Sequence, residues 1–221
     1  MTDLEREVYK LKAARDVENV MNKYEYMLSH CQLDYAFHLF ALNQPDVRME
    51  LPFGMWKGPE GIRRCIINFH GNLYLGEDGK PRPGAMYYNV NAQSIIEVAD
   101  DLKTAKGVWV APGESADQGP DGVWFENVGT AVRACDFIYD EQEKKWKMWH
   151  YRVSGWTQNS FYKACVDDFS DPQSAENFPF TDETRPDGPP SYFWQYSRDR
   201  AVNYYPYIPE PYATFSETFS Y

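Results

Sequence analysis

The pattern of apolar and polar residues changes once along this chain, from a helical period to a strand period. Between residues 3 and 30 apolar side chains recur every three or four positions, which predicts a helix with one buried face. A short helix is expected from Asp34, and the alternation at residues 47–51 indicates a strand. A turn at residues 56–61 then opens a further helix that runs from Ile62 to about Phe69.

After a loop at residues 76–84 that is rich in Gly and Pro, the period becomes two. The predicted strands are residues 86–98, 104–111, 123–139 and 146–156. Helices followed by a run of strands favour an α+β fold, with a curved antiparallel sheet packed on N-terminal helices. Such a sheet leaves a concave, mostly apolar hollow beneath the helices.

Two regions differ in composition. Residues 1–165 carry the helical and strand patterns and form the expected α+β domain. Residues 166–221 are dominated by Pro, Asp, Ser, Tyr and Phe and are expected to be irregular. Because a disordered tail is normally poor in aromatic residues, we expect this C-terminal extension to pack on the body or on a neighbouring subunit.

Charge and motifs narrow the classes of function. The net charge is −11 and Lys and Arg are not clustered, which argues against nucleic acid or an anionic membrane as a partner. No apolar run could span a bilayer, and the charged stretch Met1–Arg6 lacks a signal region, so we expect a cytoplasmic protein. The scattered cysteines lack the spacing of a zinc site, and no phosphate-binding or zinc-protease motif is present. We therefore expect neither a metal nor a cofactor.

The last predicted strand carries the first candidate chemistry. Alternation along residues 145–153 would place His150 and Arg152 on one face, after the apolar Trp146 and Met148. An imidazole suits a general base, and a guanidinium can hold an oxygen anion. The alternative is a pair at the rim of the sheet that is hydrated or held in salt bridges.

Other polar residues occupy predicted core elements. Tyr24 lies on the apolar stripe of the long helix, where its hydroxyl could donate to an oxyanion or simply be satisfied within the core. His30 lies near the end of that helix, where a structural role is also open. Arg133 is flanked by Val132 and Ala134, so it needs Glu97, Glu126 or a ligand anion as a partner. The further candidates for substrate contacts are Phe53, Tyr88, Asn89, Asn91 and Trp109.

The order of elements and several short motifs resemble the SnoaL-like branch of the nuclear-transport-factor-two-like superfamily, which includes scytalone dehydratase and bile acid 7α-dehydratase. The residues that carry the resemblance are Tyr24–Tyr35, Val47–Glu50, Gly58–Ile62, Ser94–Val98, Thr104–Gly107 and Trp146–Met148, within about residues 10–165. The resemblance implies a cystatin-like α+β barrel whose cone-shaped cavity holds a hydrophobic substrate, with acid-base side chains and no cofactor.

The catalytic positions implied by the resemblance are only partly kept. Tyr24 falls where the bile acid dehydratase has a catalytic Tyr, but its Asp becomes Ser29 here. His30 and Cys31 fall where scytalone dehydratase has Tyr and Asp, and the expected strand His is replaced by polar residues within 87–91. Either the base has moved, with His150 or His30 as candidates, or the activity differs.

The resulting hypothesis is a cofactor-independent lyase that eliminates a small molecule from a hydroxylated aromatic substrate by acid-base catalysis. The molecule lost would be water, or formaldehyde from a diaryl diol such as those derived from lignin by retro-aldol cleavage. The 17 Tyr and 7 Trp favour an aryl substrate. The alternatives are an isomerase or polyketide cyclase acting on a polycyclic substrate and a non-catalytic ligand-binding module.

Self-association is also expected. Lys147, Trp149 and Tyr151 would lie on the convex sheet face, which would then be too aromatic for open water. Together with the resemblance, this predicts a homodimer or homotrimer, with the C-terminal extension as a lid or a clasp. The sequence leaves open the substrate, the leaving group, which His is the base and the number of subunits.

Overall fold

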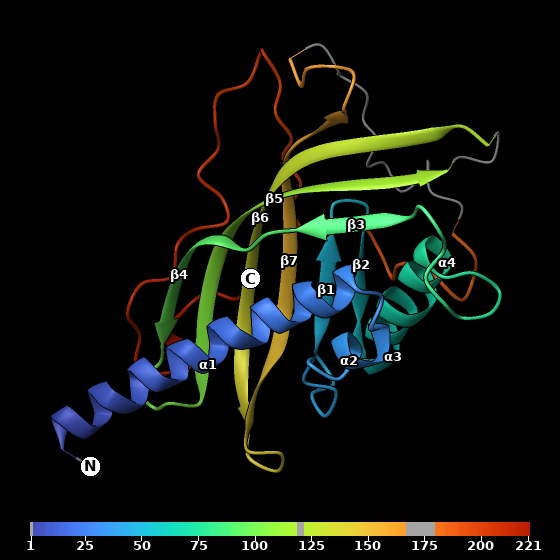
Figure 1. Cartoon of the computed structure of the whole chain (residues 1–221). Coiled ribbons are helices and arrows are strands. Elements are labelled where there is room, and N and C mark those ends of the chain that lie inside the picture. Colours follow the sequence, from blue (N-terminus) through green and yellow to red (C-terminus); the bar gives the residue numbers. More distant parts are fainter. Residues whose placement is uncertain (1, 119–121, 167–179) are drawn as a thin grey trace.

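The computed structural model describes residues 2–118, 122–166 and 180–221 (Figure 1). Helix α1 (Asp3–Ser29) begins after Thr2, whose hydroxyl accepts a hydrogen bond from the N–H of Glu5 while the Glu5 carboxylate accepts one from the N–H of Thr2. The short helix α2 (Leu33–Phe37) follows. The helical period therefore identified both N-terminal helices.

A hairpin and a broken helix come next. Their elements are β1 (Arg48–Leu51), β2 (Gly54–Lys57), α3 (Gly58–Arg63), the π-helix η1 (Arg64–Phe69) and α4 (His70–Tyr74). The prediction of a turn at residues 56–61 was wrong at its start, because Trp56 is fully buried and pairs with Met49 in the hairpin. The chain turns at Gly58, whose φ of 68° favours glycine.

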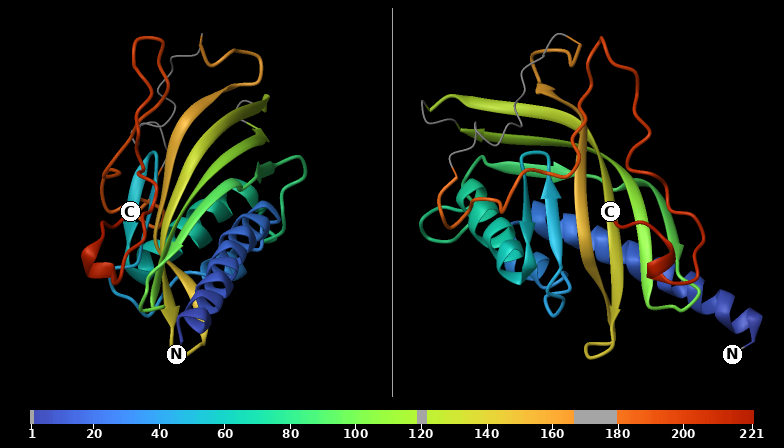
Figure 2. Two further views of the ribbon diagram at one scale, coloured as in Figure 1. Left: turned by 90° about the vertical axis from the view of Figure 1, so that its left-hand side faces the viewer. Right: turned by 180° about the vertical axis from the view of Figure 1, so that it is seen from behind.

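The remaining strands are β3 (Met86–Asn89), β4 (Ala92–Val98), β5 (Thr104–Gln118), β6 (Trp124–Asp140) and β7 (Lys145–Ser160). The strand order is β2-β1-β7-β6-β5-β3, and β4 also pairs with β5. The pair β1 and β7 is parallel and the other pairs are antiparallel, so the sheet is mixed rather than purely antiparallel. The expected α+β fold with a strongly curved sheet on N-terminal helices is confirmed, although the described strands form an open sheet (Figure 2).

Strand β5 is longer than its sequence suggested. The predicted strand ended at Ala111, because Pro112 cannot donate a ladder hydrogen bond. The strand in fact continues to Gln118, and the pairing changes beside Pro112, between the end of β3 and the start of β4. The carbonyl of Pro112 still accepts a hydrogen bond from the N–H of Val90. This break divides the single strand predicted over residues 86–98 into β3 and β4.

Helix α1 crosses the concave face of the sheet (Figure 1). Its buried side chains include Met21, Tyr24 and Leu28. The ring of Tyr24 packs edge-on against Phe40 and against Tyr151 of β7. The main core therefore lies between α1 and the lower half of the sheet, while the upper halves of β5, β6 and β7 extend beyond the helix.

The C-terminal segment 191–221 runs along the convex face of the sheet, on the side opposite α1 (Figure 2). It includes the 3₁₀ turn η3 (Phe215–Glu217). The rings of Phe215, Phe219 and Tyr221 surround Nζ of the fully buried Lys106 at 4.9, 4.6 and 4.8 Å. Such cation–π contacts help to hold a buried ammonium group.

The prediction that Lys147, Trp149 and Tyr151 share the exposed convex face was wrong. Tyr151 lies in the concave core, and Trp149 packs against Phe215 with 4.6 Å between ring centroids. The convex face near Trp149 is therefore covered by the chain itself, and a homodimer or homotrimer stays a prediction without this argument. Among the described helices, none is long and apolar enough to cross a membrane.

Candidate functional site

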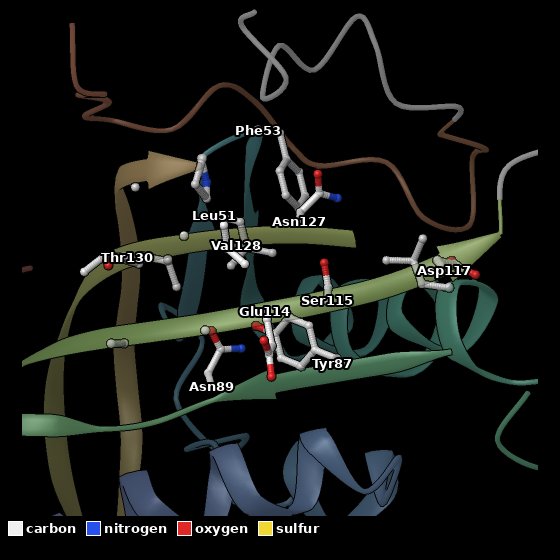
Figure 3. A pocket seen from close by; sticks show the side chains of 18 of the residues that line it. Leu51, Phe53, Tyr87, Asn89, Glu114, Ser115, Asp117, Asn127, Val128 and Thr130 are labelled. Carbon is white, nitrogen blue, oxygen red and sulfur yellow. The ribbon is translucent and has the colours of Figure 1, made fainter. Parts of the chain in front are cut away.

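A cavity of about 420 Å³ opens on the concave side of the sheet, above α1. Its floor is a run of the smallest residues on three neighbouring strands. In the strand register Ala111 faces Ala131, which faces Gly155, and Gly113 faces Gly129. Because these side chains are a hydrogen atom or a methyl group, the sheet backbone itself forms the floor and space remains above it. Leu51 and Phe53, from β1 and the turn that follows it, stand over this space (Figure 3).

His70 lines the same cavity from α4. Its Nδ1 lies 2.8 Å from the carbonyl oxygen of Cys65, and a carbonyl can only accept, so Nδ1 carries the proton. Burial lowers the pKa of His70, and the bond to Cys65 only partly opposes this shift. The ring is therefore neutral near pH 7. Its Nε2 has a free lone pair and makes no hydrogen bond to any residue in the described ranges.

The π-helix η1 helps to place His70. A wider turn in a helix changes which side chains face the core, and such turns are frequent at functional sites. Phe69 ends η1, His70 opens α4, and both line the cavity. Gly71 follows, and a Cβ atom at this position would make only ordinary contacts with Leu33 and Leu75, so the helix does not require a glycine there. The local break therefore brings an imidazole into an otherwise apolar wall.

The inner end of the cavity carries a buried cation, Arg133, whose charge is neutralised by a carboxylate. Arg133 on β6 is 2% exposed, and its Nη1 lies 2.5 Å from Oε1 of Glu25 on α1. Nη1 also donates to Oδ1 of Asn91 at 3.1 Å, while the Nε hydrogen of Arg133 has no partner among the described residues. The hydroxyl of Tyr151 lies 3.4 Å from the same Glu25 oxygen. Burial raises the pKa of Glu25, and the charge of Arg133 opposes that shift.

Two side chains of β3 form the adjoining wall (Figure 3). Asn89 lies directly over Gly113, where a Cβ atom would approach Oδ1 of Asn89 to 2.0 Å. Glycine is thus required at this position for the present placement of Asn89. Nδ2 of Asn89 is buried and has no partner within the described part of the chain. Burial raises the pKa of the neighbouring Tyr87 to about 12, so its hydroxyl stays protonated.

The predicted pair His150 and Arg152 does not face this cavity. The register of β6 and β7 shifts between Asp136 and Phe137, which pair with His150 and Met148. Trp149 is therefore the extra residue of a β-bulge, and it reverses the alternation of faces. Met148 lies in the concave core, whereas the two polar side chains point to the convex face. The prediction that His150 and Arg152 share a face with Trp146 and Met148 was wrong, because simple alternation assumes an uninterrupted ladder.

On the convex face both residues are buried beneath the C-terminal segment. Nδ1 of His150 lies 2.9 Å from Oδ2 of Asp136 and 2.9 Å from the hydroxyl of Ser220. Nη2 of Arg152 donates to Oε1 of Glu50 at 3.0 Å, and the guanidinium also contacts the hydroxyls of Ser191 and Tyr205. These contacts anchor the segment to the sheet.

The other two predicted catalytic residues are also outside the cavity lining. Tyr24 is 1% exposed and packs within the core described above. His30 is the exposed C-cap of α1, with Nδ1 2.6 Å from the carbonyl oxygen of Tyr26 and its ring stacked on the Tyr26 ring. The structure therefore does not bring Tyr24, His30, His150 and Arg152 together.

Three of the predicted substrate contacts, Phe53, Asn89 and Arg133, do line the cavity. Tyr88 is 51% exposed on the opposite face of β3, and Trp109 is buried against Phe137. Asn91 contributes indirectly by accepting from Arg133. The partner expected for Arg133 proves to be Glu25 rather than Glu97 or Glu126.

Sequence reasoning missed His70 and Glu25. His70 follows Ile62, Ile66 and Phe69 at helical spacing, so extending that apolar stripe by one residue would have placed it in the core. Glu25 lies four residues after Met21 on α1, which would have marked it as a buried carboxylate that needs a cation. Within the described ranges, no group of three or more His, Cys, Asp or Glu could hold a metal ion.

Comparison with protein-family models and with curated proteins finds no match for this sequence. Solved structures match the fold. A protein of Novosphingobium aromaticivorans provisionally assigned as a scytalone dehydratase has a TM-score of 0.51 at 13% identity, over 72% of this chain and 95% of that one. The hexachlorocyclohexane dehydrochlorinase LinA-type3 of Novosphingobium barchaimii has a TM-score of 0.53 at 13% identity, over 74% and 97%.

These likenesses define the fold class. The fold that the resemblance implies is thereby confirmed. At 13% identity the match carries no residue roles, so the chemistry of the site is argued from its own side chains.

Proposed function

We propose that this protein is a cofactor-independent lyase that removes a small molecule from a hydroxylated aromatic substrate, with His70 as the general base. One observation supports this most strongly. A buried imidazole, fixed in one tautomer by Cys65, lines an apolar cavity that also holds unpaired donors of Asn89 and Arg133. A base beside hydrogen-bond donors is the arrangement that proton abstraction next to an oxygen-bearing carbon requires.

The proposed elimination balances with these groups. Nε2 of His70 takes a proton from carbon, the electron pair forms the new double bond, and the carbon–oxygen bond breaks. The departing hydroxide takes this proton from the protonated Nε2 of His70 and leaves as water, which returns the imidazole to its neutral form. With a 1,3-diol the same base would take the proton of the terminal hydroxyl, and the carbon–carbon bond would break to release formaldehyde. The electron pair of that bond would form the double bond as the second hydroxyl departs, protonated by His70, as water. Arg133 and Asn89 would stabilise the oxygen that gains charge in either case.

The cavity and the structural neighbours support this class of reaction. A volume of about 420 Å³ suits a molecule of one or two rings, and the flat floor of Gly and Ala suits an aromatic plane. The two matched proteins are, by their names, a dehydratase and a dehydrochlorinase, which are elimination enzymes. A diaryl diol derived from lignin is the substrate that we propose to test first.

The test compares two histidine variants in buffer without metal or nucleotide. His70→Gln should abolish turnover of aryl diols, whereas His38→Gln should leave it unchanged, because His38 is exposed and lies outside the cavity lining. Product mass distinguishes the reactions, since elimination lowers the mass and isomerisation or cyclisation without loss conserves it. Full activity in folded His70→Gln, or products of unchanged mass, would contradict the proposal.

A further inference from the structure

The cavity becomes polar again at its outer end. Beyond the Gly and Ala floor, Ser115 of β5 and Asn127 of β6 are direct partners in the strand register. Both line the cavity, on the same sheet face as Gly113 and Gly129. They extend from neighbouring strands, with Asn127 beside the ring of Phe53 and Ser115 below it (Figure 3).

The hydrogen-bonding groups of this pair are not used by the protein. Neither the hydroxyl of Ser115 nor the carboxamide of Asn127 bonds to any residue that the structure describes. The charged side chains at either end of the cavity are paired, as in Arg133 with Glu25 and Arg82 with Asp117. A hydroxyl and a carboxamide together offer donors and acceptors to one ligand oxygen.

The spacing of the two polar ends sets the length of a ligand that could reach both. Asn89 at the inner end lies over Gly113, which is two residues, or about 7 Å of strand, before Ser115 on β5. Arg133 is farther away, because Arg133 and Asn127 are six residues apart on β6, which is about 20 Å of strand between their Cα atoms. The two inward positions between them are Gly129 and Ala131. A ligand that touches both ends must therefore be elongated, and it must be flat where it crosses the floor.

The charge of the outer end indicates which group binds there. Ser115 and Asn127 are neutral. The next residue of β5 on the same face of the sheet is Asp117, which lies farther out and carries a carboxylate. Arg82 already holds that carboxylate through Nη2, at 2.9 Å from each oxygen. An anionic ligand group would gain no free cation here, whereas a neutral hydroxyl could both donate and accept.

We propose that Ser115 and Asn127 form a distal subsite that binds the hydroxyl on the second ring of a two-ring substrate. The assignment of the inner end as the place of reaction rests on the proposed function. The binding of a hydroxyl by Ser115 and Asn127 does not depend on it. The inner end then holds the oxygen next to the reacting carbon, and the outer end selects substrates with a second oxygenated ring over single-ring ones.

The experiment measures equilibrium binding by tryptophan fluorescence, with 4,4′-dihydroxybiphenyl and 4-hydroxybiphenyl as rigid probes. The intact protein should bind the dihydroxy compound about fivefold more tightly, the effect of one neutral hydrogen bond. In Ser115→Ala combined with Asn127→Leu the two probes should bind equally. Ser94→Ala is the matched control, because Ser94 is exposed on β4 and should leave the fivefold preference intact. Circular dichroism checks that each variant is folded.

The subsite is refuted if neither probe binds, if the intact protein does not prefer the dihydroxy probe, or if the preference survives the double substitution. Because binding is measured without turnover, its outcome is separate from that of the lyase proposal. A preference that depends on Ser115 and Asn127 in a protein without lyase activity would uphold the subsite and reject the reaction. Turnover of aryl diols by a protein that shows no such preference would uphold the reaction and reject the subsite.

Discussion

The ion pair of Lys106 and Asp136 should contribute far more to stability than an exposed pair of the same length. Nζ of Lys106 lies 2.5 Å from Oδ1 of Asp136, and both side chains are 0% exposed. Asp136→Asn removes the charge and leaves the ammonium group of Lys106 buried among aromatic rings. Breaking a buried pair in this way costs about 3–5 kcal/mol.

The chain contains a matched control. Nζ of Lys12 also lies 2.5 Å from a carboxylate oxygen, that of Asp16, but these side chains are 70% and 43% exposed. Exposed helical pairs contribute about 0.3–0.5 kcal/mol, so Asp16→Asn should have almost no effect. Urea unfolding followed by tryptophan fluorescence would compare both variants with the parent. The midpoint for Asp136→Asn should fall by roughly 2 M.

A pH series extends the same test. Burial alone would raise the pKa of Asp136, but the hydrogen bond to His150 and the charge of Lys106 lower it below its usual value. The carboxylate therefore stabilises the fold above the ordinary Asp pKa, and this contribution is lost as the pH falls through the lowered value. Asp136→Asn should lack that part of the acid sensitivity. Equal effects of Asp136→Asn and Asp16→Asn on the midpoint would refute the reasoning.

Three further predictions concern the cavity. Because burial lowers the pKa of His70, kcat/KM should rise with pH through a value below 6.5 and be level at neutral pH, and a rise centred above pH 7 would exclude His70 as the base. Gly113→Ala should displace Asn89, whose Oδ1 would lie 2.0 Å from the new Cβ, and weaken binding of 4-hydroxybiphenyl by tenfold or more without unfolding the protein. Ala131→Leu should fill the floor and abolish binding of either biphenol, as measured by calorimetry, while Ala201→Leu at an exposed position of the C-terminal segment should not.

The sequence predicts the fold of this protein better than its site, and β7 shows why. Its composition identifies it as a strand. Assigning faces by odd and even positions, however, does not reveal that Trp149 is an extra residue. The one trace is a change of phase, because apolar residues occupy even positions up to Met148 and the odd positions Tyr151 and Val153 afterwards. Assignment of His150 and Arg152 to the cavity therefore failed although the strand itself was identified.

Contacts between distant segments were harder still to predict. The partner of Arg133 lies on α1, more than a hundred residues away, and only the fold brings Glu25 to it. Likewise, the rings that surround Lys106 belong to a segment whose Pro-rich sequence has no periodic pattern. The small residues of the floor carry no sequence signal as a group, because they become neighbours only through the register of β5, β6 and β7.

The bulge at Trp149 also matters for the comparison of this chain with its relatives. A relative without this extra residue would still place the counterparts of His150 and Arg152 on the convex face, because both keep their pairing with β6. Alignments that pass through this point without a gap would equate side chains that lie on opposite sides of the sheet. Inheritance of a catalytic role should therefore be judged here from strand pairing rather than from matching letters.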